Sequence, residues 1–141
     1  MMKIEELFSV RGKVALVTGG SRGIGQMIAR AYVENGVKVY ITARKADACD
    51  ALAKELSQFG ECISIPADIS RMGEIDRLAS EIQKHESRLD ILVNNAGSSW
   101  GAEFATFPES GWDKVMDLNV KSVFFHDATC LQIARGCRFG N

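Results

Sequence analysis

The chain of 141 residues has little of what marks several specialised classes of protein. Basic residues are not in excess, since 17 Lys and Arg stand against 18 Asp and Glu, and this balance argues against a nucleic-acid partner. No apolar run approaches the ~18 residues of a membrane span, and the N-terminus is too acidic for a signal peptide. We therefore expect one domain with no nucleic-acid or membrane partner and a cytoplasmic location.

The sequence also lacks a Cys-x-x-Cys pair. Its four cysteines, Cys49, Cys62, Cys130 and Cys137, have no secretory context, and we interpret them as reduced thiols. His126, Cys130 and Cys137 could be considered as metal ligands, but their spacing fits no common zinc pattern. We predict no metal site.

The stretch from Lys13 to Gly25 predicts a buried strand, a glycine-rich turn and a helix. Glycines 19, 23 and 25 permit a tight turn and a close approach of backbone N–H groups to a ligand, and the helix directs its positive dipole end to the same place. An anion such as a pyrophosphate is the natural occupant. The spacing Gly-x-x-x-Gly-x-Gly differs from the common Gly-x-Gly-x-x-Gly, so an ordinary strand-to-helix connection is the alternative.

Strands and amphipathic helices alternate along the chain. Strands are expected over 14–17, 37–41, 62–65 and 89–93, and helices from the turn to residue 35, over 48–59 and over 71–85. The stripes expected to face the core are Ile24, Met27, Ile28 and Ala31 in the first helix, Ala48, Leu52, Leu56 and Phe59 in the second, and Ile75, Leu78, Ala79 and Ile82 in the third. This alternation predicts an α/β fold with a Rossmann-type doubly wound parallel sheet, whose ligand crevice lies between strands one and four.

The end of the second strand indicates which dinucleotide would fit. An acidic residue about 20 positions beyond the turn would bind the ribose 2′-hydroxyl of NAD, whereas an arginine accommodates the 2′-phosphate of NADP. Here the sequence reads Thr42-Ala-Arg-Lys45, with no acid before Asp47. Arg44, together with Arg22 in the turn, therefore favours NADP(H). The alternative is that both arginines are solvated surface residues.

Two more loops follow strand ends at the same edge of the sheet. Asp68 comes after the third strand, where an adenine could lie, or where its carboxylate could cap the next helix. Asn94, Asn95 and Gly97 follow the fourth strand. Asparagine side chains can bridge neighbouring loops, and glycine permits the close approach of a ring.

A further helix is expected after a capping box at Ser110-Gly-Trp-Asp113. Its apolar stripe would comprise Trp112, Val115, Met116, Val120 and Val123. Asn119 falls within this stripe, so its amide would need partners. A structural and a catalytic role for Asn119 are both open.

Four motifs in this order resemble the short-chain dehydrogenase/reductase family. Thr18-Gly-Gly-Ser-Arg-Gly-Ile-Gly25 is similar to its cofactor turn, Asp68 to its adenine-contacting aspartate, Asn94-Asn-Ala-Gly97 to its strand-four motif, and Asn119 in Leu-Asn-Val to its catalytic asparagine. The resemblance implies a catalytic role for Asn119 and NADP(H) binding by Thr18, Gly19, Ser21, Arg22, Gly23, Ile24, Gly25, Arg44, Asp68, Ile69, Asn95, Ala96 and Gly97.

Within the family, three stretches resemble bacterial NADPH-dependent 3-oxoacyl-carrier-protein reductases, especially the type associated with rhamnolipid synthesis. These stretches are 23–29, 94–102 and 111–120. The resemblance implies reduction of a ketone, such as a 3-oxoacyl thioester, to the 3-hydroxy product, with a small-molecule or acyl-thioester substrate, acyl carrier protein as a partner and homo-oligomers of the full-length form. The alternatives are a non-catalytic NADP-binding fragment and a dehydrogenase of another small alcohol, sugar or steroid.

The sequence departs from the family towards its end. The family's proton-donor motif Tyr-x-x-x-Lys and its later strands are absent, and the two tyrosines, Tyr32 and Tyr40, have no lysine four residues on. We predict an incomplete NADP-binding domain over 1–125 and an atypical tail over 126–141, caused by a frameshift near Phe125 or, alternatively, by a shortened protein. We also expect an exposed fourth strand that invites aggregation, and no NADPH oxidation by this chain alone.

Overall fold

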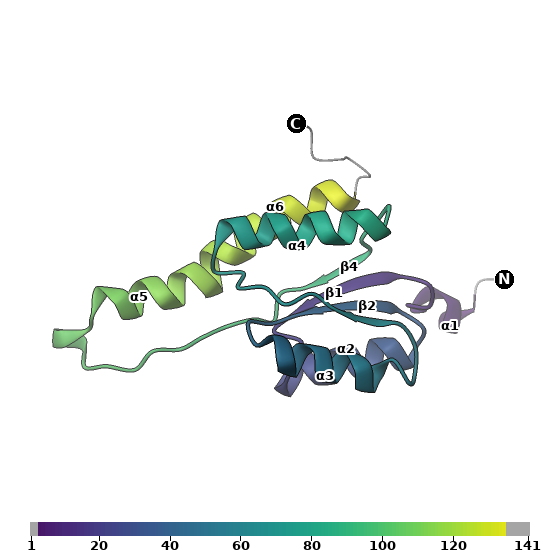
Figure 1. Ribbon diagram of the computed structural model, residues 1–141, viewed down its shortest axis with the longest axis horizontal. Coiled ribbons are helices and arrows are strands. Elements are labelled where there is room, and N and C mark those ends of the chain that lie inside the picture. Colours follow the sequence, from purple (N-terminus) through teal and green to yellow (C-terminus); the bar gives the residue numbers. More distant parts are fainter. Residues whose placement is uncertain (1–2, 135–141) are drawn as a thin grey trace.

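The computed structural model describes residues 3–134 and shows a parallel four-stranded sheet between two layers of helices (Figure 1). The elements are α1 Ile4–Leu7, β1 Val14–Thr18, α2 Gly23–Glu34, β2 Lys38–Thr42, α3 Ala46–Leu56, β3 Cys62–Ser64, α4 Met72–His85, β4 Ile91–Val93, the 3-10 turn η1 Phe104–Thr106, α5 Glu109–Met116, the π-helical turn η2 Asp117–Lys121, and α6 Ser122–Ala134.

The strand order is β3-β2-β1-β4, and every pairing is parallel. Val17 of β1 pairs with Ile41 of β2 on one side and with Val93 of β4 on the other. This order confirms the predicted doubly wound α/β fold. It also leaves β4 at an edge of the sheet, as expected, with residues 91–93 half-buried.

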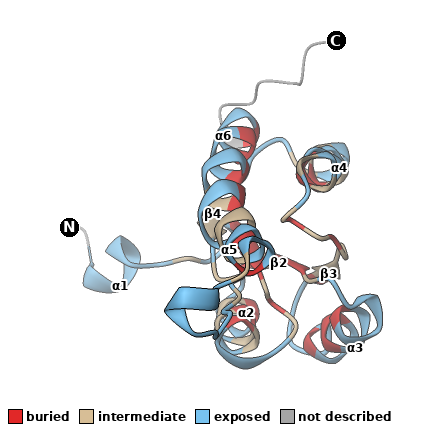
Figure 2. Ribbon diagram, turned by 90° about the vertical axis from the view of Figure 1, so that its left-hand side faces the viewer, coloured by how far each residue is buried: buried red, intermediate tan, exposed pale blue. Residues whose placement is uncertain are grey.

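Two apolar clusters form the core, one on each face of the sheet. The side chains of β1 alternate between them, because Leu16 packs with Ile75 and Ile82 of α4, whereas Val17 packs with Val33 of α2 and Leu56 of α3. Figure 2 shows buried residues on the sides of these helices that face the sheet. The first cluster contains Cys130, the second Cys49 and Cys62, and all three thiols are free.

The predicted core stripe is right for α4 and only partly right for α2, where Ile28 packs against the second cluster but Ile24, Met27 and Ala31 are exposed. Ile75, Leu78, Ala79 and Ile82 of α4 are all buried. In α2, Ile24 and Met27 are 65% and 62% exposed, and the buried positions are Gly25, Ala29 and Val33. Small residues at Gly25 and Ala29 let α2 approach β1 closely, so Ile24 and Met27 lie at the surface.

The predicted stripe of α3 is half right. Leu52 and Leu56 are buried, but Ala48 is exposed and Phe59 lies beyond the helix, exposed beneath the guanidinium of Arg30. Cys49 and Ala53 fill the core positions instead.

The capping box predicted at Ser110 is wrong. α5 begins at Glu109 after Pro108, and no side chain caps it. The predicted stripe is only partly right, because Trp112, Asn119 and Val120 are exposed. The other predicted positions, Val115, Met116 and Val123, are half-buried. Figure 1 shows α5 extending beyond the end of the sheet, so this helix does not lie on the sheet as α4 does.

α6 continues from α5 through η2 and packs against α4. Its buried positions are Ser122, His126, Thr129, Cys130 and Ile133, so polar residues occupy much of the face that meets α4. The boundary predicted at residue 125 falls inside this helix and stays a prediction. Within residues 3–134, no helix is both long and apolar enough to cross a bilayer.

Candidate functional site

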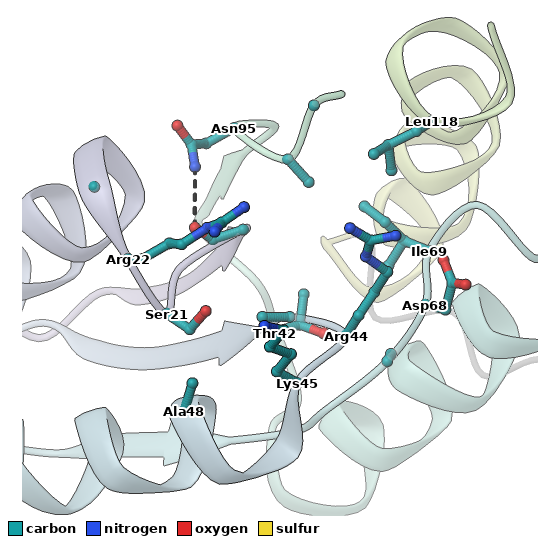
Figure 3. Close-up of a pocket in the computed structure, with 16 residues that line it drawn as sticks. Ser21, Arg22, Thr42, Arg44, Lys45, Ala48, Asp68, Ile69, Asn95 and Leu118 are labelled. Carbon is teal, nitrogen blue, oxygen red and sulfur yellow. Dashed lines mark hydrogen bonds between the residues drawn. The ribbon is translucent and has the colours of Figure 1, made fainter. Parts of the chain in front are cut away.

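A pocket of about 490 Å³ opens where the carboxyl ends of the strands meet the start of α2 (Figure 3). Its lining comes from the ends of the four strands and the loops after them, from the first turns of α2 and α3, and from η2. The lining residues are Gly19, Ser21, Arg22, Gly23, Thr42, Ala43, Arg44, Lys45, Ala48, Ala67, Asp68, Ile69, Asn95, Ala96, Gly97 and Leu118. This is the edge at which ligands bind in doubly wound sheets.

Thr18 joins the ends of β1 and β4. Its buried hydroxyl donates a hydrogen bond to the Val93 carbonyl at 3.2 Å and accepts from the N–H groups of Asn95 and Ala96, both at 3.0 Å. One side chain therefore satisfies three backbone groups at the floor of the crevice.

The glycine turn is locked against the loop after β4. Gly19 has φ +63°, and a Cβ there would lie 2.9 Å from the Ala96 Cα. The Asn95 amide donates to the carbonyls of Thr18 and Gly19, at 3.0 and 3.2 Å. A Cβ on Gly25 would lie 2.2 Å from the Gly19 oxygen, so glycine is required there by space. The turn therefore holds the start of α2, which no side chain caps, at the pocket.

Three cations and a single carboxylate line the pocket. Arg22 precedes α2, Arg44 follows β2, and Lys45 immediately precedes α3. Figure 3 shows the two guanidinium groups reaching into the pocket from opposite sides. No ion pair involves any of the three within the described residues. A ligand phosphate therefore meets cations without a competing partner.

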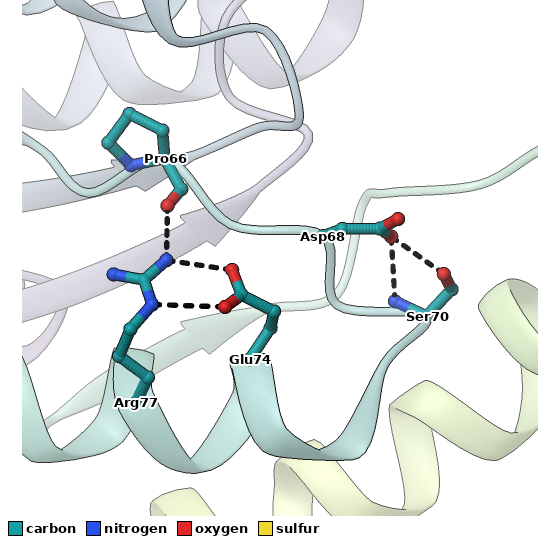
Figure 4. A network of polar contacts seen from close by, with 5 residues as sticks. All are labelled: Pro66, Asp68, Ser70, Glu74 and Arg77. Atoms are coloured by element: carbon teal, nitrogen blue, oxygen red, sulfur yellow. Dashed lines mark hydrogen bonds and ion pairs between the residues drawn. The ribbon is translucent and has the colours of Figure 1, made fainter.

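Asp68 is held in a turn of its own rather than at a helix cap. Its Oδ1 accepts from the Ser70 N–H at 3.1 Å and from the Ser70 hydroxyl at 2.6 Å (Figure 4). The residue before α4 is Arg71, which makes no side-chain cap, so the capping alternative is wrong. Arg77 braces the same loop, since it donates to the Pro66 carbonyl at 2.6 Å and pairs with Glu74 at 2.8 Å. The Arg77 guanidinium lowers the pKa of Glu74.

Asn119 stands beside the pocket and does not line it. Its Oδ1 accepts from the Ser98 N–H at 2.8 Å, and its Nδ2 donates to the Ser98 carbonyl at 2.9 Å. Both polar atoms of the amide therefore bind the backbone of the residue after Gly97. A Cβ added to Gly97 would lie 3.6 Å from the Asn119 Oδ1. The Asn119 amide therefore has the hydrogen-bond partners expected from the sequence, although the residue is exposed and not in a buried stripe.

The structure brings most of the predicted cofactor-binding residues together. Ten line the pocket: Gly19, Ser21, Arg22, Gly23, Arg44, Asp68, Ile69, Asn95, Ala96 and Gly97. Thr18 and Gly25 support the turn without lining the pocket, and Ile24 is exposed and does not line it. The pocket residues missed from the sequence are Thr42, Ala43, Lys45, Ala48, Ala67 and Leu118. Most of these neighbour Arg44 or Asp68 in the chain, whereas Leu118 carries no sequence signal.

His126 forms a separate polar cluster outside the pocket. Its Nδ1 lies 3.2 Å from the Asn94 Oδ1, and Asn94 donates to Asp127 at 2.7 Å. Burial lowers the pKa of His126 to about 4 and raises that of Cys130 to about 12. The third residue considered as a metal ligand, Cys137, lies outside the described residues. Within those residues, no group of three metal-ligating side chains occurs.

Comparison with known proteins gives matches across most of the chain. The family described as short chain dehydrogenase matches residues 13–137. The rhamnolipids biosynthesis 3-oxoacyl-(acyl-carrier-protein) reductase of Pseudomonas aeruginosa is 55% identical over 125 residues, which cover 89% of this chain and 47% of the relative. The 5-keto-D-gluconate 5-reductase of Escherichia coli is 33% identical over 122 residues, covering 86% of this chain and 48% of the relative.

Solved structures agree with this. The Pseudomonas aeruginosa RhlG/NADP active-site complex has a TM-score of 0.85 at 54% identity, over 89% of this chain and 49% of that one. The chain thus spans about half the length of the relatives it matches. The four motifs, the strand order and the family match agree, and the chain belongs to the short-chain dehydrogenase/reductase family.

Proposed function

We propose that this chain is the NADP(H)-binding half of a ketone reductase whose substrate is a 3-oxoacyl thioester. The observation that carries the proposal is the placement of Arg22 and Arg44. Both line the pocket, and Arg44 follows β2, where an NAD-binding protein would have a carboxylate for the ribose 2′-hydroxyl. A 2′-phosphate fits these free guanidinium groups, whereas a bare ribose would leave them without a partner.

The rest of the pocket fits the remaining parts of NADP(H). Asp68 and Ile69 lie beside Arg44, where the adenine would sit, and the uncapped N–H groups of α2 suit the pyrophosphate. The other half of the dinucleotide would then extend towards Asn95 and Gly97 at the end of β4. In this orientation its nicotinamide ring lies near the loop that Asn119 holds.

When bound, NADPH supplies a hydride for the carbonyl carbon of a ketone. The residues of this chain bind and orient the dinucleotide, and Asn119 keeps the loop at Gly97 in place through Ser98. The printed sequence contains no Tyr-x-x-x-Lys to donate the proton. We therefore expect NADPH binding without turnover from these 141 residues.

The choice of a 3-oxoacyl thioester rests on the identity of 55% to the Pseudomonas aeruginosa reductase, and it implies acyl carrier protein as the partner that presents the substrate. The match to a 5-keto-D-gluconate 5-reductase supports a sugar or another small alcohol as the alternative substrate class. In either case the chain would contribute the same nucleotide site.

The test compares NADPH with NADH by isothermal titration calorimetry. Loss of a charge-assisted hydrogen bond of about 1.5–3 kcal/mol predicts that Arg44→Ala weakens NADPH binding roughly ten- to a hundredfold. NADH affinity should stay unchanged, since NADH carries no 2′-phosphate. Lys54→Ala, an exposed cation of α3 that does not line the pocket, is the matched control. Equal NADPH and NADH affinities in the unaltered chain would refute the proposal.

A further inference from the structure

The loop between β4 and α5 is attached to α5 by a contact that the proposed function does not use. The indole of Trp100 packs closely against Gly111, because a Cβ on Gly111 would be only 2.7 Å from the Trp100 Cδ1 and 2.8 Å from its Nε1. The Lys114 Nζ stands 5.1 Å from the centre of the same ring. Gly111 is buried although it belongs to a helix that extends beyond the sheet.

A second attachment lies two residues earlier in the loop. Asn119 binds the Ser98 backbone on both sides, and the Ser98 hydroxyl donates to the Lys114 carbonyl at 3.4 Å. The segment 98–100 is therefore held against α5 and η2 at both ends. Gly97, immediately before it, forms the wall of the pocket at the end of β4.

We propose that Trp100, seated on Gly111, is a positioning residue that sets the pocket wall at Gly97 for the nicotinamide half of the dinucleotide. This inference rests on the proposed function. The contact between Trp100 and Gly111 requires glycine, since any Cβ at position 111 forces the indole away. The contact also requires a planar aromatic ring at position 100, which packs on α5 and lies within cation–π distance of the Lys114 ammonium. Movement of the Trp100 ring would shift the loop and, with it, Gly97. The part of the pocket that is lined by Arg22 and Arg44 would keep its position.

The test separates the two halves of the pocket by using two ligands. NADPH occupies both halves, whereas adenosine 2′,5′-bisphosphate occupies only the half lined by Arg44 and Asp68. We expect Gly111→Ala and Trp100→Ala to weaken NADPH binding about tenfold, a change of roughly 1.4 kcal/mol, and to leave the bisphosphate within twofold of its original affinity. Trp100→Phe keeps a flat ring and should restore most of the NADPH affinity.

Trp112→Ala is the matched control, because Trp112 lies on α5 next to Gly111, is 60% exposed and does not line the pocket. In a Trp112→Phe background, Trp100 is the only indole, so its fluorescence reports directly on the ring. We expect bound NADPH to quench this emission by energy transfer, and Gly111→Ala to reduce the quenching at saturation.

Each remaining outcome has a definite meaning. Unchanged NADPH affinity in Trp100→Ala, or an equal loss for both ligands in Trp100→Ala and Trp100→Phe, overturns the positioning role while the nucleotide site stands. Binding of the bisphosphate but not of NADPH by the unaltered chain also overturns it. If the unaltered chain binds neither ligand, the proposed function itself fails, and this inference fails with it.

Discussion

His126 combines deep burial with an unmet hydrogen-bonding group. The side chain is 1% exposed, and its Nε2 has no partner among the described residues. Burial disfavours the imidazolium and lowers the pKa to about 4, while the nearby Asp127 opposes that shift only in part. Native His126 therefore remains neutral at pH values where the unfolded chain already takes up a proton.

This difference predicts a loss of stability in mild acid. Since the pKa is depressed in the native state, the unfolded chain binds more protons between about pH 6.5 and 4, and the free energy of unfolding falls as the pH falls through that window, by about 3 kcal/mol at most. Urea unfolding at pH 7 and pH 4.5 measures the change.

His126→Leu should flatten the dependence between these two pH values. His85→Gln, which alters an exposed histidine at the end of α4, should leave the dependence as it is. A variant without His126 that loses stability in acid as steeply as the unaltered chain would argue against this origin.

The junction of β1 and α2 tolerates no side chain at Gly25. The Cβ of alanine would lie 2.2 Å from the Gly19 oxygen and 2.5 Å from the Asn95 Nδ2. Both groups belong to the interlocked loops, so relief of the clash must move the floor of the pocket. We expect Gly25→Ala to lower the free energy of unfolding by about 1–3 kcal/mol and to abolish NADPH binding. Thermal unfolding and calorimetric titration measure the two effects.

Gly73 provides the contrast within α4. A Cβ there meets no atom within 4 Å, and its φ is not positive. Gly73→Ala should therefore stabilise the chain by roughly 0.4–1 kcal/mol, because alanine restricts the unfolded chain without strain, and nucleotide affinity should not change. A destabilised Gly73→Ala would mean that α4 has a different conformation at its start.

The success of the sequence-based predictions differs between elements for physical reasons. The buried stripe of α4 was predictable because α4 packs on both the sheet and α6, so its apolar residues have something to cover. The pocket side chains of Arg44 and Asp68 were predictable because each lies in the loop that follows a strand, at the carboxyl edge of the sheet. The orientation of α2 was not, since backbone contact at Gly25 decides which face meets the sheet. Leu118 was also missed, because only tertiary placement of η2 brings it to the pocket.

β4 and α6 leave one side of the molecule open. A groove of about 600 Å³ runs between them, and it is lined mainly by apolar residues that include Leu89, Leu92, Phe124 and Leu131. Phe124 is 69% exposed on the groove, and β4 is the edge strand of the sheet that residues 3–134 form. An unpaired strand edge beside an apolar surface favours self-association.

We therefore expect the chain to associate as its concentration rises, and Phe124→Ser to reduce that association. Size-exclusion chromatography with light scattering, over a range of concentrations, measures the mass directly. Phe59→Ser is the matched control, because Phe59 is exposed beside α3, the helix layer on the opposite face of the sheet. An equal effect of both substitutions would show that general surface hydrophobicity, and not this groove, drives association.

The three buried thiols provide a way to observe how each layer of this molecule opens. Cys49 and Cys62 lie in the cluster beneath α2 and α3, and Cys130 lies in the cluster beneath α4 and α6. Burial raises the pKa of all three, so an alkylating reagent reacts only after the surrounding layer has separated and the thiolate can form. The alkylation rates of Cys49 and Cys62 therefore report the opening of one layer, and the rate of Cys130 reports the opening of the other. We expect Cys130 to react faster, because its layer borders the open groove.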